Sequence, residues 1–145
     1  MDIDRLAPAI TDDEIVIKAS LDTVWNLFTD ISGWSEWNKD ITYSKLNGTL
    51  AIGESFSWTT YGMNINSTIN ELIPKKEIGW SGLVMDIMGI HVWTFEETGN
   101  GVLVKTHESW SGKSVEAQKE QMQEGLDKSL RSWLEDLKTK AESLA

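Results

Sequence analysis

Hydrophobic and polar residues alternate with a period of two through the middle of the chain, from residue 41 to residue 110. In residues 54–61, Phe56 and Trp58 alternate with serine and threonine, which is typical of a strand with one buried face. Asn47-Gly48 and the Gly-Asn-Gly run at 99–101 are hairpin-turn signals. The pattern predicts six consecutive strands at residues 41–46, 54–61, 64–73, 76–83, 90–96 and 102–110, with a loop or an irregular strand start at 85–89.

Helical spacing replaces this alternation on both flanks. Leu21, Val24, Trp25 and Phe28 recur at intervals that place them on one helix face, with Ser20 as the N-cap. We expect Gly33 to separate this helix from a second short helical piece at 30–39 and a strand at 14–18 to precede it. Residues 1–12 are expected to be loose at first and to join this strand late. A long final helix is predicted from a cap at Ser114 to about residue 144, with one apolar stripe: Met122, Leu126, Leu130, Trp133, Leu134 and Leu137.

These elements predict an α+β fold in a single domain, residues 1–145. A run of antiparallel strands buries one face, and the final helix is the only large apolar element left to cover it. A curved sheet of six or seven strands should therefore wrap around this helix, with the two short helices closing one end. Glycines at 82, 89 and 125 should leave part of the space between sheet and helix unfilled.

Composition narrows the classes of partner. The formal net charge of −10 disfavours nucleic acid and anionic membrane surfaces. There is no cysteine, no secretory signal pattern and no apolar run long enough to span a membrane, so we expect a cytoplasmic protein. With two histidines and no nucleotide-binding motif, we expect no metal and no cofactor.

The last predicted hairpin brings the two most reactive side chains together. If strand residues pair with a sum near 199, His91 faces Glu108, Trp93 faces Thr106, and Phe95 faces Val104, all on the inner face, with His107 on the outer face. Burial would raise the pKa of the carboxyl group, and a nearby imidazolium would lower it. His91 and Glu108 are therefore candidates for ligand hydrogen bonding or acid–base catalysis, and equally for a buried polar pair that fixes the strand register.

Eight tryptophans form the other distinctive feature. Most fall on faces predicted to point inward, and each indole N–H needs a partner, which a ligand or water in a cavity can supply. We therefore predict an aromatic-walled ligand site. Its residues are Trp37, Phe56, Trp58, Trp80, His91, Trp93, Phe95, Thr106, Glu108, Trp110, Met122, Leu126, Leu130 and Trp133.

Several segments together resemble the START-like (SRPBCC) superfamily with its helix-grip fold, most closely the polyketide cyclase/dehydrase-like branch. They are IVIKASLDTVWNLFTDISGWSEWN near the start, WSG at Trp80, Gly-x-His at Gly89–His91, THESWSG at Thr106–Gly112 and the closing SLRSWLEDLKTKAE. The resemblance implies the helix-grip fold over almost the whole chain. It does not select one function, because the superfamily hosts transporters, cyclases and partner-binding modules.

Three functions therefore stay open. The first is a carrier or sequestering protein for a small hydrophobic, aromatic or polycyclic molecule. The second is a cyclase or dehydratase type of enzyme that uses His91 and Glu108 as acid and base. The third is a module resembling the chaperone-activator branch, which would expose an apolar patch to a protein partner. We expect a monomer or a weak dimer in each case.

Overall fold

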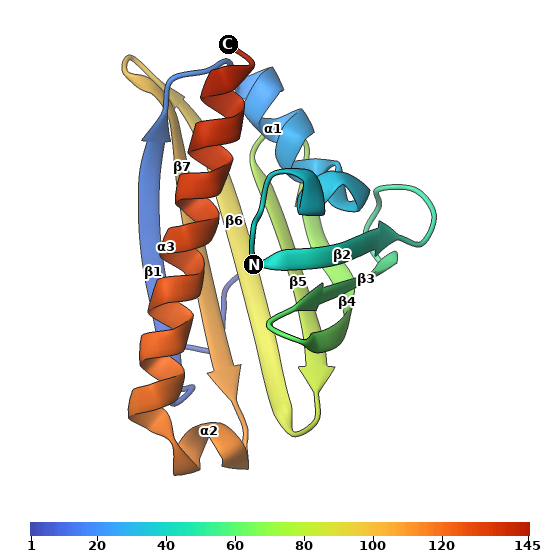
Figure 1. Cartoon of the computed structure of the whole chain (residues 1–145), viewed down its shortest axis with the longest axis vertical. Helices are drawn as coiled ribbons and strands as arrows, with labels where there is room; N and C mark the ends of the chain where they lie inside the picture. The colour runs from blue at the N-terminus through green and yellow to red at the C-terminus, as the bar shows by residue number, and fades with distance from the viewer.

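The computed structural model describes residues 1–145 and shows one antiparallel sheet that curves around a long helix (Figure 1). The seven strands lie in the order β1-β7-β6-β5-β4-β3-β2. Their bounds are β1 Ala9–Ile17, β2 Ile41–Leu46, β3 Ser55–Thr60, β4 Met63–Ile73, β5 Glu77–Val84, β6 Ile87–Thr98 and β7 Gly101–Ser111. The helices are α1 Leu21–Thr29, the 3-10 helix η1 Ile31–Glu36, α2 Lys113–Ala117 and α3 Lys119–Ser143. This is the helix-grip arrangement predicted from the sequence.

The register of the β6–β7 hairpin is the predicted one. His91 pairs with Glu108, Trp93 with Thr106, and Phe95 with Val104. The side chains predicted to point inward on these strands are buried or face the interior cavity, whereas His107 lies on the outer face and contacts Asp12. The period-two pattern therefore placed each side chain on the correct face of the sheet.

A dense aromatic core fills the upper part of the space between α1, α3 and the sheet. Trp34 from η1 is fully buried, and its indole N–H donates to the carbonyl of Phe28 at 2.7 Å. The Trp34 ring lies 5.3 to 5.9 Å from the rings of Phe56, Trp58 and Trp133, within the range of favourable aromatic pairs. These rings form one packed cluster at that end of the space, and two of them, Trp58 and Trp133, also line the cavity described below.

Polar contacts hold α3 against the β1 edge of the sheet. Gln123 exchanges hydrogen bonds with the backbone of Ile10, and Arg131 donates to the carboxylate of Asp13 and to the carbonyl of Glu14. Figure 1 shows α3 lying in front of β1, β7 and β6, with β2, β3 and β4 curling away on the other side. The helix therefore lies over the β1 side of the sheet rather than over β2, β3 and β4.

Two element boundaries near the start differ from the prediction. The first strand begins at Ala9 rather than at residue 14, because it pairs with β7 along its whole length. Residues before it are not loose: Ile3 is buried, and the backbone N–H of Asp4 donates to the hydroxyl of Ser109 on the outer face. The first helix ends at Thr29, so Gly33 lies inside η1 rather than separating two helices.

The final helical region is divided, which the sequence did not predict. Gln118 takes a non-helical conformation between α2 and α3. Ser114 lies inside α2 rather than capping it, and both its backbone N–H and its hydroxyl donate to the carboxylate of Asp86. For residues 85–89 the prediction was a loop or an irregular strand start: Asp86 belongs to a tight turn with Met85 at a φ of 55°, and β6 starts directly after it at Ile87. These bonds fix α2 to the β5–β6 turn.

Ser20 caps α1 as predicted, and its contribution is measurable. Its hydroxyl oxygen accepts a hydrogen bond from the N–H of Thr23 at 3.1 Å. We expect Ser20→Ala to lower the free energy of unfolding by about 1 kcal/mol in urea titrations, since the cap bond is lost. The control Ser35→Ala, at an exposed site, should change it by less than about 0.5 kcal/mol. Equal effects of the two substitutions would contradict the capping role.

Candidate functional site

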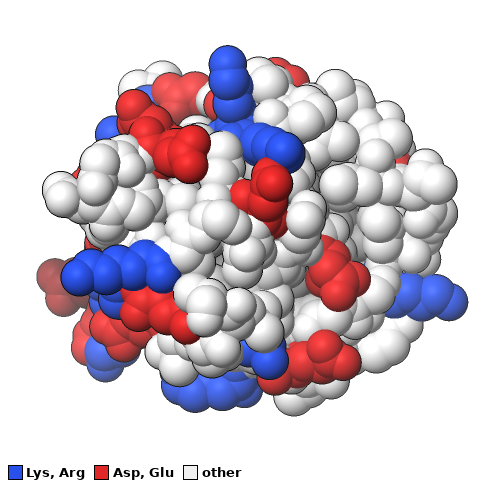
Figure 2. Space-filling view, turned by 90° about the horizontal axis from the view of Figure 1, so that it is seen from above, with Lys and Arg blue, Asp and Glu red and all other residues white.

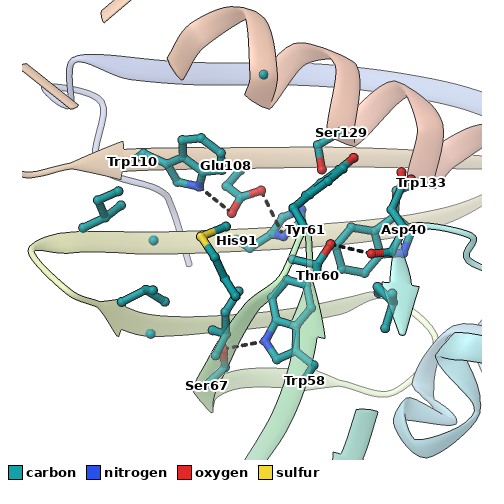
Figure 3. Close-up of a pocket in the computed structure, with 18 of the residues that line it drawn as sticks. Asp40, Trp58, Thr60, Tyr61, Ser67, His91, Glu108, Trp110, Ser129 and Trp133 are labelled. Atoms are coloured by element: carbon teal, nitrogen blue, oxygen red, sulfur yellow. Dashed lines mark hydrogen bonds and ion pairs between the residues drawn. The ribbon is translucent and has the colours of Figure 1, made fainter. Parts of the chain in front are cut away.

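A cavity of about 480 Å³ lies between the first half of α3 and the inner face of the sheet. Its wall comes from all the strands from β2 to β7 and from α3, together with the segment before β2 and the β3–β4 turn. Figure 3 shows the labelled side chains of this wall converging on one space from the strands and the helix. The volume is within the usual range of small-molecule sites, roughly 300–1,000 Å³.

Three glycines were predicted to leave this space unfilled, and Gly125 is the one that faces open space. Gly82, Gly89 and Gly125 all lie in the cavity wall. A Cβ atom at Gly125 would meet no atom within 4 Å, although this residue is in the middle of a helix. Glycine at a mid-helix position costs about 1 kcal/mol relative to alanine. The open space therefore exists at some expense in helix stability.

Four tryptophans make the aromatic part of the wall: Trp58, Trp80, Trp110 and Trp133. The indole N–H of Trp58 donates to Ser67 at 3.1 Å, and that of Trp110 donates to the carboxyl group of Glu108 at 2.9 Å. The N–H of Trp133 is buried and has no hydrogen-bond partner in the protein. Flat aromatic faces on several sides favour a flat apolar guest.

His91 and Glu108 form the polar end of the cavity (Figure 3). The Nδ1 atom of His91 lies 3.3 Å from Oε1 of Glu108, but it is not aligned for a hydrogen bond. Its Nε2 atom is 2.8 Å from the hydroxyl oxygen of Thr106. The side chain of His91 is 1% exposed and that of Glu108 is 13% exposed. The pair is therefore almost completely removed from water.

Burial decides the protonation of both groups. It raises the pKa of Glu108 to about 8, an effect that the hydrogen bond from Trp110 partly opposes. Burial also holds the pKa of His91 well below its usual range, and the positive charge of His107 adds to this. At neutral pH the site therefore contains a carboxylic acid beside a neutral imidazole, rather than an ion pair.

The mouth of the cavity lies between the β3–β4 turn and α3. Tyr61 in this turn has a φ of 48° and extends toward Ser129 and Asp40 (Figure 3). Its partial burial and the nearby Asp40 carboxylate raise the pKa of Tyr61. Lys128 is the positively charged residue in the cavity wall, and its amine lies 3.0 Å from the carboxylate of Glu124. Polar groups thus surround the opening, while the inner surface is mostly apolar.

Half of the fourteen residues predicted for the site lie in the cavity wall. They are Trp58, Trp80, His91, Glu108, Trp110, Met122 and Trp133. Those on the strands share the predicted inward parity, and those on α3 face the β3–β6 side.

The structure places the other seven outside the cavity wall: Trp37, Phe56, Trp93, Phe95, Thr106, Leu126 and Leu130. Trp93, Phe95 and Phe56 have the correct parity but lie farther along their strands, where Phe28 and Trp34 pack against them. Leu126 and Leu130 are fully buried in the core and do not line the cavity. Trp37 lies in a separate shallow groove beside Asp136 and Lys140, and Thr106 reaches the site only through His91.

Sequence reasoning missed several wall residues for which a signal existed. Thr60 shares the parity of Phe56 and Trp58, and Ser67 shares that of Ile65 and Ile69. Ser129 is four residues from both Gly125 and Trp133, and so lies on the same helix face. Tyr61 and Asp40 gave no signal, because they belong to a turn and to the segment before a strand.

The comparisons agree with this architecture. The family described as "Polyketide cyclase / dehydrase and lipid transport" matches residues 8–142. The chain belongs to this family. Its fold is that of the START-like superfamily, as the sequence segments indicated. No curated protein matches the sequence significantly.

Solved structures with this fold share little sequence with the chain. A hypothetical protein from Helicobacter pylori, jhp0584, matches with a TM-score of 0.84 at 19% identity, over 93% of this chain and 89% of that one. A START superfamily protein from Mycobacterium smegmatis matches with a TM-score of 0.81 at 11% identity, over 94% and 99%. The di-domain ARO/CYC protein StfQ of the steffimycin biosynthetic pathway matches with a TM-score of 0.79 at 14% identity, over 93% of this chain and 51% of StfQ. At these identities the likeness concerns the fold.

Surface charge and metal-ligating residues give little further information about the function of this site. No helix is both long and apolar enough to cross a membrane. No three His, Cys, Asp or Glu side chains gather in a way that would hold a metal ion. Figure 2 shows acidic and basic residues interspersed with uncharged surface at one end of the molecule, without a continuous basic patch. The aromatic cavity is therefore the feature of this structure that best indicates a function.

Proposed function

We propose that this protein binds a small apolar ring compound in the cavity under α3, and carries or sequesters it in the cytoplasm. The observation that supports this most is the 480 Å³ space walled by four tryptophans and opened by Gly125. Most of its other wall residues are apolar or small, and the few convergent polar groups are those expected to orient a ligand. The lack of cysteine is in keeping with a reducing compartment.

A neutral polycyclic dye tests this proposal directly. We expect Nile red to bind at one site, to gain emission in the apolar cavity and to quench tryptophan fluorescence. Dye at about 100 times its Kd should stabilise the folded protein by about 2.7 kcal/mol, because it binds only the native state. If neither fluorescence nor melting temperature responds to Nile red or to naphthalene derivatives, the binding proposal fails.

Acid–base catalysis is the second candidate function, and the raised pKa of Glu108 favours it. A carboxylic acid with a pKa of about 8 is a proton donor near neutral pH, and it faces a cavity able to hold a ketone. We expect such a site to accelerate exchange of the C1 protons of 2-tetralone with D2O, followed by NMR. His91→Ala and Glu108→Gln should each reduce this exchange at least about a hundredfold. Exchange at the buffer rate with the native protein would exclude this activity toward ketones of that size.

A further inference from the structure

We propose that the ligand is an uncharged ring compound that places one oxygen, a ketone or a hydroxyl, against the Glu108 carboxyl group. This inference rests on the proposed binding function and specifies its ligand class. Glu108, His91 and Thr106 would form one hydrogen-bond chain that recognises the ligand oxygen. The hydrogen bonds of this chain can all donate toward the ligand or all donate away from it. The chain starts in the cavity wall and ends in the buried core.

The geometry supplies the links of this chain. The hydroxyl of Thr106 lies 2.8 Å from Nε2 of His91, and Nδ1 of His91 lies 3.3 Å from Oε1 of Glu108. Nδ1 is a buried polar atom without a hydrogen-bond partner, in a side chain that is 99% removed from water. Such an atom is costly to leave unpaired. A small rotation of the Glu108 carboxyl group would align it with Nδ1, and a ligand bound to Oε2 would fix that rotation.

The chain has two proton arrangements, because each of its members both donates and accepts. In the first, Thr106 donates to Nε2, Nδ1–H donates to Oε1, and the Oε2 hydroxyl donates to a ligand ketone. In the second, a ligand hydroxyl donates to Oε2, the Oε1 hydroxyl donates to Nδ1, and Nε2–H donates to Thr106. No proton leaves the chain, and both arrangements are uncharged. The site can therefore accept a ketone or a hydroxyl at the same place.

Trp110 and the surrounding charges restrict the ligand further. The indole of Trp110 donates to Oε2 in either arrangement, so the carboxyl group keeps its place in the wall. No cation lies beside Glu108. The wall's lysine, Lys128, is at the mouth, where it is largely exposed and paired with Glu124. An anionic ligand would therefore lose its hydration at the inner end without compensation.

Four naphthalenes of similar shape separate these features: 2-acetylnaphthalene, 2-naphthol, 2-ethylnaphthalene and 2-naphthoate. Their affinities are measured by displacement of Nile red near pH 6.5. We expect the ketone and the phenol to bind about tenfold more tightly than the ethyl compound, which has the same size but no oxygen. The carboxylate should bind more weakly than all three.

Two variants and a control locate the effect. Glu108→Leu should abolish the preference of the ketone over the ethyl compound, because the group that reads the oxygen is gone. Thr106→Val should reduce this preference without abolishing it, since Thr106 positions His91 and does not touch the cavity. Glu96→Leu, at an exposed site on the same strand as His91, should leave the preference unchanged.

A rise in pH supplies a signature that needs no substitution. The titratable and charged groups that face this region are His91 from β6, Lys128 from α3, Tyr61 from the β3–β4 turn and Asp40 before β2, with His107 and Asp127 beyond the wall. Near pH 9, Glu108 is ionised and only accepts hydrogen bonds. The ketone should then lose about tenfold in affinity, while the phenol, which donates, should keep most of its own.

The possible outcomes distinguish this inference from the proposed function. If the ethyl compound binds as tightly as the ketone and the phenol, and Glu108→Leu does not change these affinities, the cavity is a ligand site. The proposed hydrogen-bond chain then does not recognise the ligand oxygen. If none of the four displaces Nile red, or Nile red itself does not bind, the proposed function fails as well. Preferential binding of 2-naphthoate would also overturn the inference.

Discussion

Glu108→Gln is expected to raise the free energy of unfolding by about 3 kcal/mol at pH 7, measured by urea denaturation. Burial raises the pKa of Glu108 to about 8 in the folded protein, whereas in the unfolded chain the carboxyl group ionises near the usual glutamate value of 4.5. Ionised Glu108 in the unfolded chain therefore competes with folding at neutral pH. Glutamine has nearly the same shape and never ionises, so it removes this competition.

The sign of the pH dependence follows from the same shift. Between pH 4.5 and about 8 the folded state holds one proton more than the unfolded state, so stability falls as the pH rises. The lowered pKa of His91 has the opposite effect below the usual histidine value of 6.5, where the unfolded chain takes up the extra proton. The two contributions offset each other between 4.5 and 6.5. From pH 6.5 to 8, stability should fall by about 1 kcal/mol per pH unit, and the fall should level off near pH 8 as the folded protein also releases the proton.

The matched control is Glu96→Gln, because Glu96 is exposed on the same strand as His91. We expect Glu108→Gln to remove the fall in stability between pH 6.5 and 8, and Glu96→Gln to keep it. If the native protein shows no such fall, or if Glu108→Gln destabilises it by more than about 1 kcal/mol, Glu108 is ionised in the folded state.

Gly125→Phe should abolish the binding of Nile red, with a loss of at least about a hundredfold, while the protein stays folded. The new ring would occupy the space that lies over Gly125, between α3 and the tryptophans. Stability should be unchanged or should rise by up to about 1 kcal/mol, since glycine is the poorest residue other than proline inside a helix. Fluorescence titration and urea denaturation of the same preparation measure both effects.

Gln121→Phe is the control for this substitution. It adds the same ring to α3 at an exposed position outside the cavity wall, so the affinity for Nile red should not change. Gly125→Ala should stabilise the helix by about 1 kcal/mol and reduce affinity far less than phenylalanine does. Tight Nile red binding by Gly125→Phe would place the binding site elsewhere on the protein.

The sequence predicted the fold and the face of each strand because these depend on local periodicity. The turn at 99–101 sets the register of the last hairpin, and the register sets the parity of His91, Glu108 and Trp110. Whether an inward side chain lines the cavity or packs in the core depends instead on which other elements cover that part of the sheet. Trp93 and Phe95 were therefore predicted for the site, although Phe28 packs against them.

The shape of the cavity depends on the lateral position of α3, which periodicity does not specify. Contacts such as Arg131 with Asp13 hold the helix toward β1, so that Gly125 and Trp133 face the cavity while Leu126 and Leu130 fill the core. The bonds from Ser114 to Asp86 could not be predicted from the sequence, because they join segments 28 residues apart. The break at Gln118 was not predicted either.

The proposed function and its ligand class both require that the space between α3 and the tryptophans holds a neutral ring ligand with its oxygen at Glu108. A crystal structure of the protein grown with 2-acetylnaphthalene tests it most directly. We predict density for the rings among Trp58, Trp80 and Trp110, with the ketone oxygen within hydrogen-bond distance of the Glu108 carboxyl group. Density for the compound at another place, or a cavity closed by the protein's own side chains, would contradict the claim.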